Sequence, residues 1–210
     1  MTRFEVLVEG PSDVPAVREV LVRRFGLTEN EDFRIHPHQG KGSLPTNLKE
    51  GRDPTKRGLL NQLPSKLRGY ATYLSPNDVV LVVIDADDSP VEQLVTDLNV
   101  MLDNLSARPE RVLFQLAIEE TESWFIADIA AVQTAFPKAK VAPLRKIPPD
   151  AIVGAWEQLA KAIGSTGSSG TDKRRWAEKI CPHLNLDNPP SPSFQRLISG
   201  IAGELAVDHP

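Results

Sequence analysis

The chain has 210 residues, of which 40% are hydrophobic and 25% charged, so it carries enough apolar side chains to form a folded core. The formal net charge of -4 gives no global positive field, and binding to nucleic acid would need local basic patches or bound metal ions. The single cysteine, Cys181, excludes an internal disulfide framework and a cysteine-rich zinc site. No apolar run reaches the roughly 20 residues of a membrane helix, and we expect a cytoplasmic protein without a membrane segment.

The first 118 residues alternate between strand-like apolar runs and helical spacings. The run at 79–84 is the strongest, because uninterrupted apolar residues indicate a central parallel strand buried on both faces. Strands are predicted at 4–9, 33–35, 79–84 and 111–117, and helices at 14–25, 57–74 and 91–105. This order predicts an α/β fold, in which a mainly parallel sheet of about four strands is flanked by helices.

The pattern changes after Ala117, where helical spacings continue without further strands. Helices are predicted within 119–135, 151–163 and 174–180, and from Ser191 onward. A segment rich in glycine and serine at 164–170 indicates a flexible loop before Lys173. We therefore divide the chain into a sheet core, 1–118, and a helical extension, 119–210, which we expect to pack on the core and contribute to its site.

Acidic side chains follow three of the predicted strands. These residues are Glu9 and Asp13 after the first strand, Asp85, Asp87 and Asp88 after the third, and Glu119, Glu120 and Glu122 after the fourth. The carboxyl ends of parallel strands meet at one edge of a sheet, where ligands gather. Alternation along a strand groups Asp85 with Asp87, and helical spacing groups Glu119 with Glu122.

Converging carboxylates repel one another and stay ionised together only with cations present. Their oxygens suit Mg²⁺ or Mn²⁺, and a pair of such ions can clamp the attacking and leaving oxygens of a phosphodiester.

Several of these acidic residues also have a purely structural interpretation. Asp13 suits a helix N-cap, Asp88 a turn, and Glu119 and Glu120 the start of a helix. Glu9 has no capping role, since it follows a buried strand directly and precedes glycine.

These residues resemble the Toprim domain of topoisomerases, primases and overcoming-lysogenization-defect nucleases. The Toprim signature places a glutamate after the first strand, as in Val8-Glu9-Gly10-x-x-Asp13, and an Asp-x-Asp after a later strand, as in Asp85-Ala86-Asp87. The resemblance covers roughly the first 118 residues. It implies a Mg²⁺- or Mn²⁺-dependent nuclease-like centre, with Glu9 as metal ligand or general base and Asp85 and Asp87 as metal ligands.

The whole chain is similar to a narrower bacterial Toprim-like family, whose members are often encoded beside ATPases. The shared features are Gly40-Lys41-Gly42-Ser43-Leu44, the glutamate of Glu122-Ser123-Trp124, a helix bearing Lys173, and Ser191-Pro192-Ser193-Phe194. This similarity implies a partner ATPase on a separate polypeptide, because the chain has no Walker A sequence. Phage defence is the setting it suggests.

Basic residues provide candidate contacts to phosphate. Lys41, Arg52, Lys56 and Arg57 fall in the long loop and at the start of the second predicted helix, and Lys173 follows the Gly/Ser segment. Such a group gives salt-dependent affinity for nucleic acid or forms an ordinary solvated surface. Lys41 and Lys173 are the catalytic candidates, since each also matches the narrower family and either could neutralise charge on a scissile phosphate.

Three functions remain open from the sequence. The first is Mg²⁺-dependent cleavage of DNA or RNA, with Asp13 and Glu122 completing a second metal position beside Glu9, Asp85 and Asp87. The second is a non-catalytic subunit that senses nucleic acid or nucleotide within an ATPase complex. The third is a phosphoacceptor receiver, against which the Val-Glu-Gly sequence and the helical extension argue.

Overall fold

The computed structural model describes residues 2–49, 53, 55–87, 89–167 and 169–207. Its centre is a four-stranded sheet in the order β2-β1-β3-β4, with every neighbouring pair parallel. The strands are β1 (Phe4–Val8), β2 (Phe33–Pro37), β3 (Val79–Asp85) and β4 (Arg111–Ala117). The predicted α/β fold with a parallel sheet of four strands flanked by helices is confirmed.

The helices follow the predicted order. They are α1 (Val14–Glu19), the π-helical η1 (Val20–Arg24), α2 (Leu59–Tyr70), α3 (Val91–Asp103), α4 (Glu122–Ala127), α5 (Ile129–Ala135), α6 (Ala155–Ile163), α7 (Gly170–Ile180) and α8 (Pro192–Ala206), with 3₁₀ turns η2 (Leu144–Lys146) and η3 (Cys181–His183). Among the described residues, no helix is both long and apolar enough to cross a membrane.

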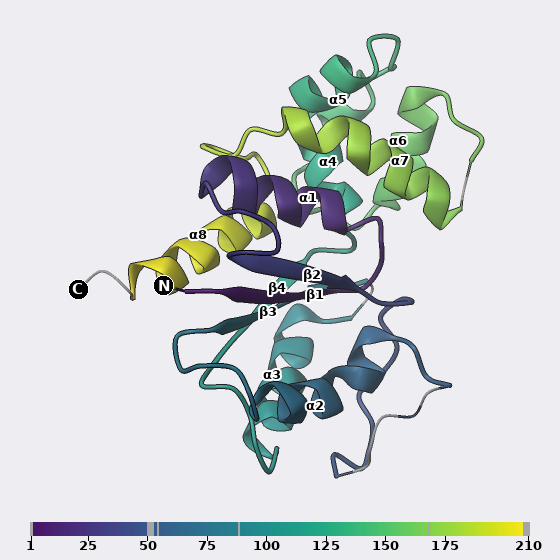
Figure 1. Cartoon of the computed structure of the whole chain (residues 1–210). Helices are drawn as coiled ribbons and strands as arrows, with labels where there is room; N and C mark the ends of the chain where they lie inside the picture. The colour runs from purple at the N-terminus through teal and green to yellow at the C-terminus, as the bar shows by residue number, and fades with distance from the viewer. Residues whose placement is uncertain (1, 50–52, 54, 88, 168, 208–210) are drawn as a thin grey trace.

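The sheet is covered on both faces, and alternation along each strand assigns its side chains to one face or the other. Leu81 and Val83 of β3 join the core that lies under α1 and the helices after β4, whereas Val80 and Val82 join the core under α2 and α3. Figure 1 shows α2 and α3 on one side of the sheet and α1, α4, α7 and α8 on the other. The molecule is thus a three-layer α/β/α sandwich.

The last helix is fixed by a polar network at its first turn. The Asp150 carboxylate accepts hydrogen bonds from Ser191 Oγ at 2.6 Å and from the Ser193 backbone N–H at 2.7 Å. Trp124 of α4 donates its indole N–H to Ser193 Oγ at 2.8 Å, and its ring stacks on Phe194 with the centroids 4.8 Å apart. The Ser-Pro-Ser-Phe sequence therefore joins α8 to α4.

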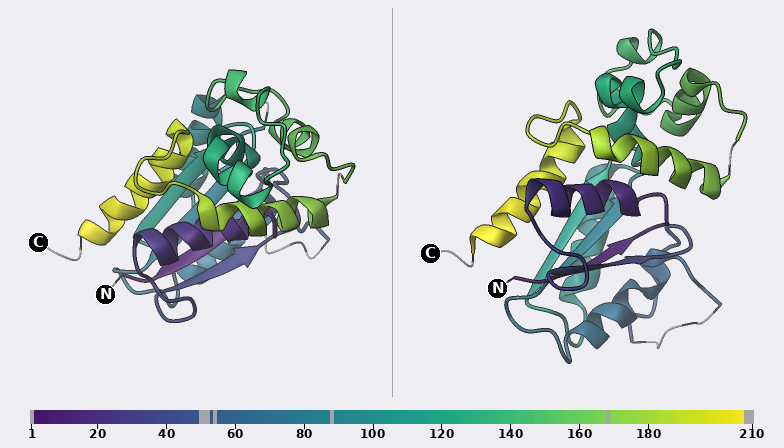
Figure 2. Two further views of the ribbon diagram at one scale, coloured as in Figure 1. Left: turned by 90° about the horizontal axis from the view of Figure 1, so that it is seen from above. Right: turned by 45° about the horizontal axis from the view of Figure 1, so that its top comes forward.

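Helix α8 then runs along the edge strand β4, where it packs closely (Figure 2). A Cβ added at Gly200 would press against the end of the Gln115 side chain, so a larger residue there would require Gln115 to move. Near the C-terminal end of α8, Glu204 pairs with the Arg111 guanidinium of β4 at 2.7 Å.

Candidate functional site

The first part of the site is the turn between β1 and α1. Asp13 occupies the N-cap position of α1 but makes no capping bond to that helix. Its carboxylate instead accepts the Gly10 N–H at 2.8 Å and the Thr121 hydroxyl at 3.0 Å. Asp13 is 4% exposed and Glu9 is 9% exposed, so this turn holds two carboxylates away from solvent.

The end of β3 adds Asp85 to this edge. Because β3 pairs with β1, the Asp85 backbone N–H reaches Glu9 and donates to its Oε1 at 2.8 Å. Asp87 lies outside the strand, since β3 ends at Asp85 and Asp87 has φ = +50°. The alternation that groups Asp85 with Asp87 in the sequence therefore does not extend to Asp87, whose side chain is 59% exposed.

The loop before α2 brings Lys41 to the same edge. Lys41 Nζ donates to the Ala86 carbonyl and to Asp87 Oδ2, each at 3.0 Å. The chain turns at Gly42, which has φ = +67° and lies against Asn61, so a Cβ at Gly42 would fall 2.1 Å from Asn61 Oδ1. Glycine is needed at that position to place Lys41.

The segment after β4 supplies three glutamates with different roles. Glu119 accepts the backbone N–H groups of residues 153–155 at 2.6 to 3.1 Å, and therefore caps the start of α6. Glu120 accepts the Trp156 N–H at 2.7 Å through one oxygen and binds Lys173 through the other. Glu122 is 2% exposed at the start of α4.

Lys173 on α7 lies between two of these glutamates. Its Nζ is 2.7 Å from Glu120 Oε2 and 3.9 Å from Glu122 Oε2, and it sits 5.2 Å from the centre of the Trp156 ring. The side chain is only 22% exposed. The helical extension thus places a cation within the acidic edge of the sheet.

The surroundings of these acids favour their protonated forms. Burial raises the pKa of Glu9 to about 8, and the nearby Asp13 and Asp87 add to the shift, while the Asp85 N–H and Lys41 oppose it. Burial also raises the pKa of Glu122 to about 7 against the effect of Lys173.

The pKa values of the other acids move in the same direction. Loss of solvation raises the pKa of Asp85 well above its ordinary value, and Asp13 and Glu9 add to this shift. Burial likewise raises the pKa of Asp13 and of Glu120, although the Gly10 N–H opposes the first shift and Lys173 opposes the second. Although burial lowers it, the pKa of the Lys173 ammonium is raised overall by Glu122 and Glu120.

The candidate metal ligands are of the chemical type that a hard divalent cation prefers. All candidate ligands are carboxylate oxygens, and Glu122 Oε1 is buried without any hydrogen-bond partner. An unpartnered buried carboxylate oxygen is costly and indicates that a partner is missing. Within the described ranges, however, no three acidic, histidine or cysteine side chains are already spaced to hold a metal ion. Asp13 instead bonds to Gly10 and Thr121, and Glu120 bonds to Lys173.

The sequence-predicted basic residues divide into two groups. Lys41 and Lys173 reach the acidic edge, whereas Lys56 and Arg57 are exposed before α2 and no ion pair joins either of them to the described acids of the edge. Arg52 lies outside the described residues.

Two residues of the site were not singled out as ligands or partners by the sequence. Glu120, which holds Lys173, and Thr121, which binds Asp13, both precede α4 in irregular backbone. No periodicity governs the direction of side chains in such a segment, so their roles could not be read from spacing.

His36 and His38, at the end of β2 and just beyond it, have separate environments. His36 Nε2 is 2.5 Å from Glu5 Oε2 on the sheet face. His38 donates its Nδ1–H to the Val8 carbonyl at 2.9 Å, and burial lowers its pKa.

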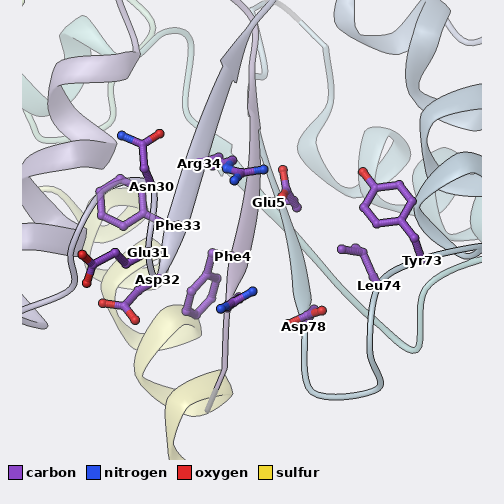
Figure 3. Close-up of a pocket in the computed structure, with 11 residues that line it drawn as sticks. Phe4, Glu5, Asn30, Glu31, Asp32, Phe33, Arg34, Tyr73, Leu74 and Asp78 are labelled. Atoms are coloured by element: carbon purple, nitrogen blue, oxygen red, sulfur yellow. The ribbon is translucent and has the colours of Figure 1, made fainter.

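Two of the cavities among the described residues lie at opposite edges of the sheet. One of about 530 Å³ lies beside the acidic edge and is lined by parts of 10–12, 38–40 and 170–174. The other, of about 340 Å³, lies at the opposite edge, where Phe4 begins β1 and Asp78 precedes β3. Figure 3 shows Phe33 and Asn30 on one side of the strands and Tyr73 on the other. This second cavity contains none of the clustered carboxylates.

No curated protein matches the chain significantly. Among solved structures, the chain is similar to the C-terminal region of the OLD protein of Xanthomonas campestris pv. campestris. In the structure phased with iodine, that region is 16% identical to this chain, and the TM-score is 0.48. The match covers 100% of this chain and 98% of that one. The same region phased with mercury is 15% identical, with a TM-score of 0.49 over 100% and 99%. Likeness of this degree says nothing about activity. The model of the family described as "Domain of unknown function (DUF4276)" matches residues 8–202, so the chain belongs to that family.

Proposed function

We propose that the chain is a nuclease-like protein that cleaves phosphodiester bonds in DNA or RNA with Mg²⁺ or Mn²⁺. The observation that carries this proposal is the convergence of carboxylates from the ends of β1 and β3 and the start of α4 in a poorly solvated edge. Repulsion and burial raise the pKa values of Glu9, Asp85 and Glu122 together. A protein keeps such a set when a cation returns the acids to their charged forms.

Each acid has a proposed place around the cation. Glu9, Asp13 and Asp85 would hold it, because they lie at the same edge of the sheet and Asp13 and Glu9 both raise the pKa of Asp85. Glu122 and Asp87 would extend the ligand set. When bound, a divalent ion polarises a phosphoryl oxygen and neutralises developing charge. The Toprim-like order of Glu9, Asp85 and Asp87 along the chain agrees with this assignment.

The remaining proposed roles are proton transfer and contact with the phosphate groups of the substrate. Glu9 is the candidate general base if it does not hold the ion, since its pKa of about 8 lets it take up or release a proton near neutral pH. Lys41 pairs with Asp87 and Lys173 with Glu120, and each would contact oxygens of a phosphate bound at the acidic edge. Lys56, Arg57 and Arg52 would extend contact along the nucleic-acid backbone.

Lys41 and Lys173 also support a second candidate function, which is binding without cleavage. Because Lys41 and Lys173 already neutralise part of the edge, the chain could bind nucleic acid or nucleotide without cleaving it, as the sensing subunit of a separate ATPase. Phage defence would be the setting of either function.

Cleavage assays separate the two functions. We expect labelled DNA or RNA to be cut only with Mg²⁺ or Mn²⁺, and Asp85→Asn to lower the rate by at least about 100-fold, the usual scale for losing a catalytic electrostatic group. Asp103→Asn is the matched control, since Asp103 pairs with Arg108 on the surface of α3. Binding of nucleic acid without cleavage in either protein would favour the sensing subunit.

A further inference from the structure

The acidic edge has two halves that differ in how their charge is balanced. In the first half, the donors described for Glu9 and Asp13 are all neutral. They are the backbone N–H groups of Asp85 and Gly10 and the hydroxyls of Thr121 and Ser12. The nearby Lys41 is committed to Asp87. Within the described chain, no basic side chain forms an ion pair with Glu9, Asp13 or Asp85.

The second half already contains a cation. Lys173 Nζ lies 2.7 Å from Glu120 and 3.9 Å from Glu122, and the face of Trp156 covers it at 5.2 Å. A charge-assisted hydrogen bond of this length in partly dry surroundings is among the stronger polar contacts of a protein. A divalent ion entering this half must displace the ammonium or share the glutamates with it.

The anchoring of this half makes such displacement unfavourable. Glu120 cannot turn freely toward a new ligand, because its second oxygen accepts the Trp156 N–H at 2.7 Å. Glu122 offers a free oxygen, Oε1, but is 2% exposed, and its other oxygen lies 3.9 Å from Lys173. An ion held by this one oxygen would need waters as its remaining ligands, and the buried position of Glu122 leaves little access for them.

We propose that Lys173 is the resident second cation of the site, so that the nucleic-acid-free protein takes up one divalent ion in the Glu9–Asp13–Asp85 half and excludes a second. This inference rests on the proposed function, because it assumes that the acidic edge binds metal. Lys173 is then an internal competitor that regulates the metal content of the site.

A phosphate group should relieve this competition. A phosphate that enters between the halves offers Lys173 a new anionic partner and leaves Glu120 and Glu122 available to a second ion. Since such coupling is reciprocal, the second ion and the phosphate must favour each other's binding. The site would then assemble its full cation set only with substrate present.

Titration of Mn²⁺ into the purified chain by calorimetry tests this proposal. We expect one ion per chain for the wild type and for Lys173→Arg, and two for Lys173→Met, which removes the charge and keeps the aliphatic stem. Lys179→Met is the matched control, because Lys179 lies on the same helix and also covers an aromatic ring, Phe136, at 5.3 Å. The control should bind one ion.

A second titration needs only the wild-type chain and so remains decisive if Lys173→Met does not fold. With a cleavage-resistant phosphorothioate oligonucleotide, the wild type should bind two ions, and without it one. Two ions bound without any oligonucleotide, both lost in Asp85→Asn, would overturn the inference and leave the metal site intact. No Mn²⁺ bound by the wild type under either condition would instead overturn the proposed function.

Discussion

At the scale of single residues, the acids of the edge store unfavourable free energy in the metal-free protein. Glu9 and Glu122 are nearly inaccessible to water, and the neighbouring carboxylates add repulsion to the cost of burying each charge. Protonation relieves both effects, and so would a bound cation. The site therefore links stability, pH and metal in one equilibrium.

The pH dependence of stability follows from the sign of these shifts. The pKa of Glu9 rises from 4.5 to about 8 and that of Glu122 to about 7 on folding, so the native state holds more protons than the unfolded state between these values. The contribution of these two acids to the free energy of unfolding is therefore greatest below pH 4.5 and is lost as the pH rises toward 8. We expect the Tm measured with EDTA to fall over this range, and Mg²⁺ to flatten the decline.

The control for this measurement is Glu9→Gln, which cannot ionise at that position. Its Tm should change less with pH than that of the wild type under the same conditions. A wild-type Tm that rises steadily from pH 5 to pH 8 in EDTA would contradict the buried-acid description.

The sequence located part of this site for a clear physical reason. Glu9, Asp13 and Asp85 follow strands whose apolar runs are unmistakable, so their meeting at one edge was predictable. The position of the Asp87 side chain was harder to predict, because a positive φ at this residue redirects the chain just after β3. The function of Glu120 depends on the position of α7, which lies far away in sequence, and no local pattern encodes that contact.

At the scale of elements, the helices after β4 are held by side chains that cap each other's ends. Glu119 satisfies the first N–H groups of α6, and Asp150 satisfies the serines that begin α8. Ser169 and Asp172 form a reciprocal capping box at the start of α7, one residue before Lys173. These contacts place Lys173 and Trp156 at the acidic edge.

Removing the Asp150 carboxylate should loosen the start of α8. Asp150→Ala leaves the hydroxyls of Ser191 and Ser193 without their common acceptor. We expect a loss of about 1–3 kcal/mol in the free energy of unfolding, the usual cost of unsatisfied buried polar groups. Urea denaturation measures it, with Asp187→Ala as the control at an 88% exposed side chain. Equal stability of both variants would show that the network does not hold α8.

At the scale of the whole molecule, one continuous core joins the sheet to the helices that follow it. Val6 and Val8 of β1 share this core with Trp124, Leu159 and Phe194 from the helical extension. The fold of the sheet was predictable from periodicity, because buried parallel strands leave a strong signal. The placement of the later helices was not, since their amphipathic faces say what they bury but not against which partner.

Truncation after residue 118 tests whether the two predicted parts are separable. Fragment 1–118 keeps α1 but loses the later helices that cover the same face, so part of the core around Val6, Val8 and Val83 would be exposed. We therefore expect an insoluble or unfolded product. Size-exclusion chromatography and circular dichroism of the refolded fragment measure the outcome. A monomeric fragment with cooperative unfolding would identify 119–210 as a separate interaction module.

The central claim is that the acidic edge binds a divalent cation, and a crystal structure with Mn²⁺ tests it most directly. Anomalous scattering locates manganese independently of any assumption about its ligands. We predict an anomalous peak within about 2.0–2.5 Å of carboxylate oxygens from Glu9 and Asp85, the range of oxygen bonds to such ions. A crystal grown in saturating Mn²⁺ with no peak at this edge would contradict the claim.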